Sequence, residues 1–542
     1  MRSIEDFQDQ IATIFQDAMA IPSFTNTESE RAIEDYLDQR LASIHYFQEN
    51  PHHFGRYPLP NDHLHRSVNW ALVDKGKKKT VILFHHHDTV NLEDYGPLAP
   101  IALDSEALVQ ALKGIDFRSE MQEDLNSGQW QFGRGSCDMK AALALQLGVL
   151  EAYASDPAGG QVNLLYLSVG DEESYSRGMR GALNLLCQLK DEFDLDYVLA
   201  VDSEPFEAGS DKEKVLHIGT VGKLMPVVVA QGVLSHMKEP LKGINALSLL
   251  IAVASKLDLH PDLSDHALGE RSPLPSWSYL RDLKDQYDVS TVLHAAGYFS
   301  VLHLKKTPQE LLQRIKELSQ EAVDEFYVKY LSLQDQAGQD HVISQPRVIS
   351  YQELLDRCQK KEGFSSFQDQ CEQRAYQAFL SGVSYQIIAI QQIQSFLEFL
   401  SEKKPLVVIG FAPPYYPSMN CRSLPNTSLK IGSLVDDYRH YLESRGLSLK
   451  VEEYFMGICD TSYCALERDL ASYQVVLDSL ASPSQVYELD LENIAQIQVP
   501  AVNLGPWGKE LHQRGERVFR EDLLDTIPSY LFGLLYRLDE LL

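Results

Sequence analysis

Apolar residues gather along the chain in short runs that lack the alternation of a half-exposed strand. Val81 to Phe84, Val162 to Val169, Tyr197 to Val201 and Val499 to Leu504 are each typical of a strand buried on both faces. Helical stretches alternate with these runs, and the small and apolar run from Ala141 to Leu150 is a clear example. The alternation predicts an α/β fold, with a mixed, largely parallel sheet and helices on both faces.

Each apolar run leads into a histidine or a carboxylate. These residues are His85-His86-His87-Asp88 after the first run, Asp171-Glu172-Glu173 after the second, Asp202-Ser203-Glu204 after the third and His512 beyond the fourth. In a parallel sheet the carboxyl ends of the strands meet at one edge, where ligands bind. We therefore expect these side chains to share one site.

Three consecutive carboxylates at the end of a buried strand indicate a bound cation. Like charges repel and burial disfavours ionisation, so Asp171 to Glu173 are costly to hold together unless a metal ion neutralises them. His86 offers a nitrogen ligand, and Asp88 can hydrogen-bond and orient its ring. A lone His-x-Asp is more often an ordinary turn, and Asp138 could simply cap the helix that follows it. The repetition along the chain favours the metal site.

A segment of different character interrupts this pattern. Its elements are a strand-like run at 224–231, a helical run at 245–257, a strand-like run at 296–304 and a helix that begins at Thr307-Pro308. This order predicts an inserted βαββαβ domain over residues 223–345.

The remainder of the chain is expected to form one catalytic domain from residues 1–222 and 346–542. Residues 350–403 have a mostly helical pattern. The strand-like run from Pro405 to Phe411 is interpreted as the return of the chain to the first domain.

Composition narrows the possible partners and the compartment. The 542-residue chain carries 77 acidic and 48 basic side chains, and its net charge of −29 makes nucleic acid and anionic membranes unexpected partners. The start of the chain lacks the pattern of a signal peptide, and apolar stretches such as Leu247 to Ala254 are too short to span a bilayer. We expect a cytoplasmic protein. Seven scattered cysteines predict reduced thiols, and the lack of a CxxC pair gives a thiolate zinc site no support.

Seven ordered motifs carry a resemblance to a known family. They are His86-x-Asp88, Gly133-Arg134-Gly135-x-x-Asp138-Met139-Lys140, Asp171-Glu172-Glu173, Glu204-Pro205, Gly232-x-x-x-His236, Gly243-x-Asn245-Ala246 and Gly505-Pro506 with His512. In this order they resemble the two-zinc aminoacylase and carboxypeptidase family, which includes succinyl-diaminopimelate desuccinylase, acetylornithine deacetylase and bacterial glutamate carboxypeptidase. Tyr287 to Ser290 and Ala296 to Phe299 look like the arginine-utilisation (RocB-like) branch.

The resemblance implies two zinc ions per chain, with cobalt or manganese as substitutes. Asp138 would bridge the ions, His86 and Glu204 would complete one site, and Glu173 and His512 would complete the other. Each ion then has three protein ligands and an open position for water, as a catalytic zinc requires.

The resemblance also implies that Glu172 is the general base and that Asp88 orients His86. Two assignments stay open at this stage. His85 or His87 could take the place of His86, and Asp202 could take the place of Glu204, which is preferred because a proline follows it directly.

The inserted domain is expected to act as a lid and dimerisation domain. By resemblance, His236 reaches the active site of the partner subunit in a homodimer, and Asn245 lies in the same substrate-binding segment. No arginine can be matched to the clamp that binds the substrate carboxylate in the family.

The expected function is metal-dependent hydrolysis of an amide bond in a small peptide or N-acyl amino acid. Such a peptidase or deacylase would serve arginine or amino-acid catabolism, as the resemblance implies. One alternative is a two-metal phosphoesterase, which clustered basic residues would favour. The other is a catalytically silent metal-binding regulatory protein, which the loss of Glu172 would have indicated.

Overall fold

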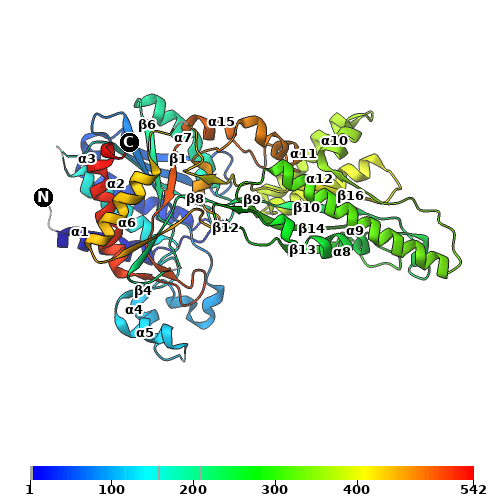
Figure 1. The fold of residues 1–542 in the computed structure, drawn as a ribbon, viewed down its shortest axis with the longest axis horizontal. Coiled ribbons are helices and arrows are strands. Elements are labelled where there is room, and N and C mark those ends of the chain that lie inside the picture. Colours follow the sequence, from blue (N-terminus) through cyan, green and yellow to red (C-terminus); the bar gives the residue numbers. More distant parts are fainter. Residues whose placement is uncertain (1–3, 116, 157–158, 208, 285, 426) are drawn as a thin grey trace. The chain divides into compact units, whose positions relative to one another are not determined.

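The computed structural model describes residues 4–115, 117–156, 159–207, 209–284, 286–425 and 427–542. They form two compact units, each with its own large sheet (Figure 1). The first unit comprises Met1–Thr220, Met419–Glu467 and Asp490–Leu542, and the second comprises Val221–Ser418 and Arg468–Leu489. The second unit begins close to the expected boundary at 223, but it extends well beyond the expected end at 345.

The first unit contains an eight-stranded mixed sheet with a parallel centre. In spatial order its strands are β1 (Phe54–Pro58), β2 (Ser67–Val73), β5 (Asn163–Val169), β3 (Lys79–His86), β6 (Asp196–Asp202), β19 (Ala501–Asn503), β7 (Glu213–His217) and β18 (Ser448–Glu452). The four strands from β5 to β19 run parallel, and they contain the four apolar runs seen in the sequence. The predicted α/β fold with a largely parallel sheet is confirmed.

Helices pack on this sheet in two groups. Their members are α1 (Ile4–Ala20), α6 (Lys140–Ala154) and α16 (Ile527–Arg537) in the first group, and α2 (Glu30–Ser43), α7 (Arg177–Glu192) and α15 (Leu491–Ile497) in the second. In the first group α6 contacts β3 and β5 and is packed between its two neighbours. In the second group α7 contacts β2 and β5, and α2 contacts β1 and β2.

Helix α6 is apolar on all sides because it is buried on all sides. Gly148 allows α1 to approach closely, since a Cβ atom there would lie 2.5 Å from Cγ1 of Ile11. The one amide on this helix, Gln146, donates to the carbonyl oxygen of Phe84 and to Oγ of Ser203, at 2.9 Å each. It thereby ties the helix to the ends of β3 and β6, where the expected site lies.

Residues 93–127 form a separate helical segment of the first unit. It contains η1 (Glu93–Ile101), α4 (Ser105–Leu112) and α5 (Ser119–Ser127), and it leads into the small sheet of β20 (Gly508–Lys509), β21 (Arg517–Phe519) and β4 (Trp130–Phe132). Figure 1 shows α4, α5 and β4 close together. The segment packs through its own apolar cluster, in which Leu108 and Leu125 lie with Trp130, Trp507 and Phe519.

The second unit has the expected βαββαβ order. Its elements are β10 (Pro226–Gln231), α8 (Ala246–Leu257), β13 (Ser276–Asp282), β14 (His294–His303), α9 (Pro308–Gln336) and β15 (Arg347–Ser350). Thr307 caps α9 with a reciprocal capping box to Glu310, as its sequence predicts. β9 (Gly222–Leu224) pairs with the far part of β14.

The expectation that residues 405–411 return to the first domain is wrong. They form β16 (Leu406–Phe411), which lies between β10 and β15 in the sheet of the second unit, in the order β13-β14-β10-β16-β15. All of its residues are buried. A strand buried on both faces has a continuous apolar pattern, which carries no information about the sheet that it joins.

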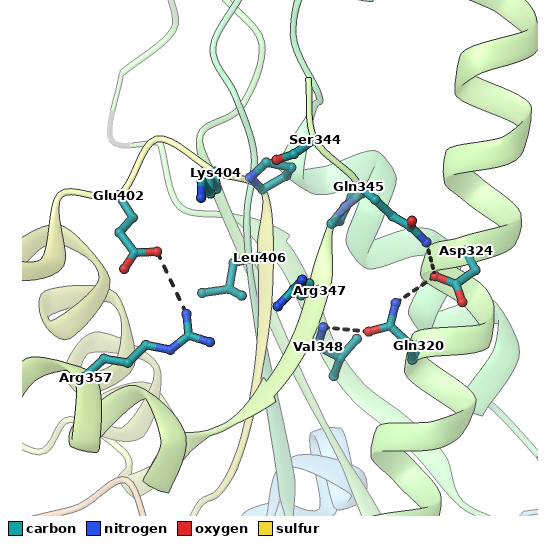
Figure 2. A pocket seen from close by; sticks show the side chains of 12 residues that line it. Gln320, Asp324, Ser344, Gln345, Arg347, Val348, Arg357, Glu402, Lys404 and Leu406 are labelled. Atoms are coloured by element: carbon teal, nitrogen blue, oxygen red, sulfur yellow. Dashed lines mark hydrogen bonds and ion pairs between the residues drawn. The ribbon is translucent and has the colours of Figure 1, made fainter. Parts of the chain in front are cut away.

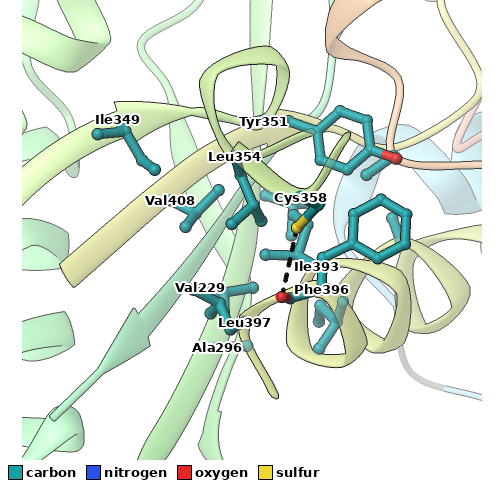
Figure 3. Packing of buried hydrophobic residues seen from close by; sticks show 14 of the residues in the cluster. Val229, Ala296, Ile349, Tyr351, Leu354, Cys358, Ile393, Phe396, Leu397 and Val408 are labelled. Carbon is teal, nitrogen blue, oxygen red and sulfur yellow. Dashed lines mark hydrogen bonds between the residues drawn. The ribbon is translucent and has the colours of Figure 1, made fainter. Parts of the chain in front are cut away.

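Three further helices cover one face of this sheet and enlarge the second unit. They are α10 (Tyr351–Gln359), α11 (Phe364–Leu380) and α12 (Tyr385–Leu400). Figure 3 shows Val229 and Val408 from the strands facing Ile393 and Leu397 of α12. Because strands and helices share this core, the unit extends beyond the βαββαβ insert.

The outer edge of β15 is covered by α9. The amide of Val348 donates to Oε1 of Gln320 at 2.9 Å, and Gln320 and Gln345 both donate to Oδ1 of Asp324 (Figure 2). A pocket of about 580 Å³ lies beside this network, with Arg347 among its lining residues. By contrast, β13 at the other edge pairs only with β14 among the described residues.

None of the helices in the described ranges is long and apolar enough to cross a membrane. All seven cysteines are buried free thiols, in agreement with the prediction from their spacing.

Candidate metal centre

Three parallel strands deliver His86, the acidic run of Asp171 to Glu173, and Glu204 to one edge of the first sheet. β3 ends at His86, β5 ends two residues before Asp171, and β6 ends two residues before Glu204. The register pairs His86 with Val169 and Phe84 with Asp202, so the three strands end side by side. The expected gathering of these side chains at the carboxyl edge is therefore observed.

One group of candidate ligands surrounds the imidazole of His86. Its Nε2 atom lies 3.0 Å from Oδ1 of Asp138, 3.5 Å from Oε1 of Glu204 and 3.9 Å from Oε2 of Glu172. One ligand atom from each of His86, Glu172 and Glu204 lies within 4.8 Å of the other two. We call these three residues the His86 group.

A second group lies on the other side of Asp138. Nε2 of His512 is 3.0 Å from Oδ2 of Asp138 and 3.0 Å from Oε2 of Glu173. Asp138, Glu173 and His512 meet the same 4.8 Å criterion and are called the His512 group. The two oxygens of Asp138 thus face one histidine each, so this carboxylate lies between the two groups.

Asp88 supports both the histidine and the acidic run. Nδ1 of His86 donates to the carbonyl oxygen of Asp88 at 2.9 Å, which leaves Nε2 free as a ligand. The carboxylate of Asp88 accepts from the amides of Glu172 and Glu173, at 3.1 and 3.2 Å. This aspartate is completely buried. It therefore holds the loop after β5 as well as the ligand at the end of β3.

The electrostatics of the cluster call for a cation. Burial raises the pKa of Glu172 and of Glu204 well above the usual range, and neighbouring carboxylates add to both shifts. Hydrogen bonds to Asp138 and Glu173 raise the pKa of His512 to about 11. Carboxylates that are this costly to ionise, with an imidazole in each group, match the donors that catalytic zinc prefers.

The neighbouring histidines are engaged elsewhere. His85 shares a hydrogen bond of 3.0 Å between its Nδ1 atom and Oε1 of Gln146, and His87 one of 2.9 Å with Oγ of Ser168. Burial lowers the pKa of each to about 3. Asp202 accepts from the amide of Ser203 at 2.8 Å. The geometry thus gathers His86 and Glu204 into the candidate groups, and not these alternatives.

The remaining two predicted residues belong to the second unit. His236 is exposed, and its Nδ1 atom accepts from the amide of Lys238 at 3.1 Å. Asn245 is the N-cap of α8 and accepts from the amide of Leu247 at 2.9 Å. The local structure accounts for Asn245 as a helix cap, and the substrate role of both residues stays a prediction.

Two buried acids near the groups were missed by the sequence analysis. Oε1 of Glu516 accepts from the amides of Cys137 and Asp138 at 3.3 and 3.4 Å, and Oε2 pairs with Arg134. Asp460 is buried, has a pKa raised to about 7 by burial, and raises the pKa of Glu172. Neither residue follows one of the apolar runs used in the sequence analysis, so no hydrophobic pattern points to it.

Comparison with known proteins agrees with this geometry. The model of the peptidase family M20/M25/M40 matches residues 82–530. The chain is 29% identical to the uncharacterized protein YqjN of Bacillus subtilis (strain 168), over 97% of this chain and 95% of the relative. It is 26% identical to Protein RocB of the same organism, over 96% and 93%, which confirms the RocB-like resemblance. The crystal structure of aminopeptidase PepT from Bacillus cereus shares the fold, with a TM-score of 0.53 and 12% identity over 98% and 99% of the two chains.

Proposed function

Because the chain belongs to the peptidase family M20/M25/M40, we propose that it is a two-metal hydrolase that cleaves an amide bond of a small peptide or N-acyl amino acid. The observation that carries this proposal is the position of Asp138, whose two oxygens each lie 3.0 Å from a different histidine. A carboxylate between two ligand groups suits a pair of ions better than one ion. The ions supply polarisation of the substrate carbonyl and a lowered pKa of water.

The donor set supports zinc as the ion, with cobalt or manganese as substitutes. His86 and Glu204 would hold one ion, Glu173 and His512 the other, and Asp138 both. Each ion would then have three protein ligands and would keep one position for water or substrate.

Glu172 is the proposed general base. Its carboxylate is nearly buried and reaches within 3.9 Å of Nε2 of His86, while its neighbour Glu173 bonds to His512. Burial raises the pKa of Glu172, which strengthens it as a proton acceptor, as a general base requires. It would accept the proton of the attacking water as the new C–O bond forms, and pass it to the nitrogen as the C–N bond breaks.

The second unit is the proposed lid and dimerisation domain of a homodimer, with His236 and Asn245 on the substrate. Support comes from the open edge of β13 and from apolar side chains exposed beside it, Leu280 on β13 and Ile251 on α8. Pairing this edge with a second copy would satisfy its backbone groups.

The test of a role in trans mixes His236→Ala and Glu172→Gln chains under conditions that exchange subunits. Partial recovery of activity supports action in trans, and no recovery despite exchange excludes it.

The full-length similarity to RocB supports a substrate from arginine or other amino-acid catabolism. The decisive experiment is metal analysis of the purified chain, followed by a screen of dipeptides, tripeptides and N-acyl amino acids. We expect two ions per chain, loss of turnover with a chelator and recovery with zinc. An active metal-free preparation would overturn the proposal. Metal binding without any cleavage would favour the regulatory alternative, and cleavage of phosphate esters alone would favour the phosphoesterase.

A further inference from the structure

His512 is held differently from the other candidate ligands. It does not end a strand of the large sheet but lies in the loop of residues 510–516 between β20 and β21. Its backbone φ is +60°, and its side chain is 48% exposed. The large sheet therefore does not fix its position, although its Nε2 atom must reach Asp138 and Glu173.

Asp124 of α5 binds both ends of this loop. Its Oδ2 atom accepts from Nζ of Lys509 at 2.9 Å and from Nε of Arg517 at 2.8 Å. Lys509 is the last residue of β20, and Arg517 is the first residue of β21. A single carboxylate thus bonds both to the residue before the loop and to the residue after it.

Burial makes this link strong. The side chain of Arg517 is 2% exposed and that of Asp124 is 13% exposed, so solvent weakens their attraction little. Arg517 also donates to Oε1 of Glu510 and to the carbonyl oxygen of Gly515, at 3.0 and 2.9 Å. It therefore bonds within the loop as well as to the helix.

The helical segment of residues 93–127 provides a firm base for Asp124. Its apolar cluster includes Leu125 of α5 together with Trp130 of β4, Phe519 of β21 and Trp507, which directly precedes β20. Nζ of Lys509 lies over the rings of Trp130 and Trp507, at 4.5 and 4.6 Å from their centroids. Helix, small sheet and loop are thus one packed assembly.

We propose that Asp124 is a positioning residue for His512, through which the helical segment of residues 93–127 sets the affinity of the His512 group for its metal ion. The inference rests on the proposed function, because it requires His512 to be a ligand. Asp124 belongs to neither group of candidate ligands. It acts by holding Lys509 and Arg517, and so limits the positions open to the imidazole.

The test is metal titration of the full-length Asp124→Asn chain against a chromophoric chelator. Loss of a residue that bonds directly to a ligand typically costs about 10–100-fold in metal affinity, and because Asp124 acts on His512 only through Lys509 and Arg517 the expected loss is at the lower end, about 10-fold. We expect a loss of that size for one of the two ions and none for the other. With cobalt as the probe, the visible absorption of one site should change while that of the other stays. Both readouts are independent of turnover.

Glu120→Gln is the matched control. Glu120 lies on the same helix and pairs with the same Lys509 at 2.8 Å, but its side chain is 69% exposed, and the ion pairs of Arg517 are with Asp124 and Glu510. Removing its charge should leave both affinities unchanged. Equal losses in the two variants would show that only the charge near Lys509 matters, and would overturn the role of Asp124.

The remaining outcomes separate this inference from the proposed function. If the wild-type chain binds no metal, the proposed function fails. If wild type binds two ions and Asp124→Asn binds both unchanged, or weakens both equally, the inference fails and the proposed function stands. Should circular dichroism show that Asp124→Asn does not fold, Lys509→Gln removes one of the two links. It should weaken the same ion by a smaller factor, and unchanged affinity would overturn the inference.

Discussion

The two halves of the proposed metal centre are held in place by different bonds. His86 ends a strand that pairs with β5 on one side and β6 on the other, so main-chain hydrogen bonds fix it. His512 lies in a loop whose ends are held by side-chain ion pairs to Asp124. The two candidate histidine ligands are therefore held in position by different parts of the molecule. Substitutions of nearby charge should affect the two ions differently.

The His86 half also has buried charge behind it. Arg66 is 1% exposed and donates to Glu30, Asp62 and Asp171, with distances of 2.8 to 2.9 Å to the nearest oxygens. Asp171 directly precedes Glu172, so this cluster supports the acidic run. The His512 half has the more exposed histidine, with a side chain 48% exposed against 1% for His86. We expect substitutions behind the His86 half to lower the stability of the fold. Substitutions around the His512 loop should lower metal affinity alone.

The largest expected effect distinguishes the base from the ligand in the acidic run. Glu172→Gln should lower turnover by about 10²–10⁴-fold, the usual contribution of a general base, while metal content stays. Glu173→Gln should instead lose the ion of the His512 group, because Glu173 bonds to His512. Steady-state kinetics and elemental analysis of both variants measure this. The opposite pattern would mean that the two roles are reversed.

The buried charge behind the His86 half should dominate the stability of the first unit. Arg66→Met should lower the free energy of unfolding by about 3–5 kcal/mol, because it leaves buried carboxylates without their cation. Arg314 is a matched control, since it also lies near three carboxylates, those of Asp262, Glu317 and Glu321, but is 33% exposed. Arg314→Met should cost about 0–1 kcal/mol. Urea denaturation gives both values, and equal small losses would contradict the prediction.

Asp88 should be the counterpart of Asp124 on the other half. Asp88→Asn keeps the main-chain bond to His86 but removes the carboxylate charge of Asp88, whose Oδ1 atom lies 3.5 Å from Nδ1 of His86. We expect a loss of about 10–100-fold in affinity for the ion of the His86 group. Chelator competition on the Asp88→Asn and Asp124→Asn chains should show losses at different ions. A loss at the same ion in both variants would remove the distinction between the halves.

The smallest expected effect is a release of protons on metal binding. The pKa of His512 is raised to about 11 by Asp138 and Glu173, so the metal-free side chain is protonated at neutral pH. A histidine ligand must be neutral, so metal binding releases this proton, and the metal affinity falls as the pH is lowered. Calorimetry in two buffers of different ionisation enthalpy counts the protons. Binding that is independent of buffer would contradict the prediction.

The same pKa sets the sign of a stability effect in the metal-free chain. A raised pKa means that protonation favours the folded state, fully so below about 6.5, the ordinary value for histidine. This contribution is lost as the pH rises through about 11. The free energy of unfolding of chelator-treated protein should therefore fall as the pH rises toward about 11. The fall should be smaller in His512→Gln, and urea denaturation at several pH values measures it.

Much of the site could be predicted because its signal is local. Burial on both faces produces continuous apolar runs, and the residues that end them face one edge of a parallel sheet wherever the strands lie in it. This is why His86, Glu172 and Glu204 could be located from their own neighbours in the chain. The capping box at Thr307 and the βαββαβ order are local in the same sense.

What the tertiary structure decided is the choice of partner between distant residues. The apolar pattern of β16 predicts a buried strand, but packing against α12 and β10 places it in the second sheet. The links from Asp124 to Lys509 and Arg517, and from Glu516 to Asp138, join residues hundreds of positions apart. The sequence of a segment determines its hydrophobic periodicity and the chemistry of its side chains. The contacts between distant segments depend on how all the elements pack together.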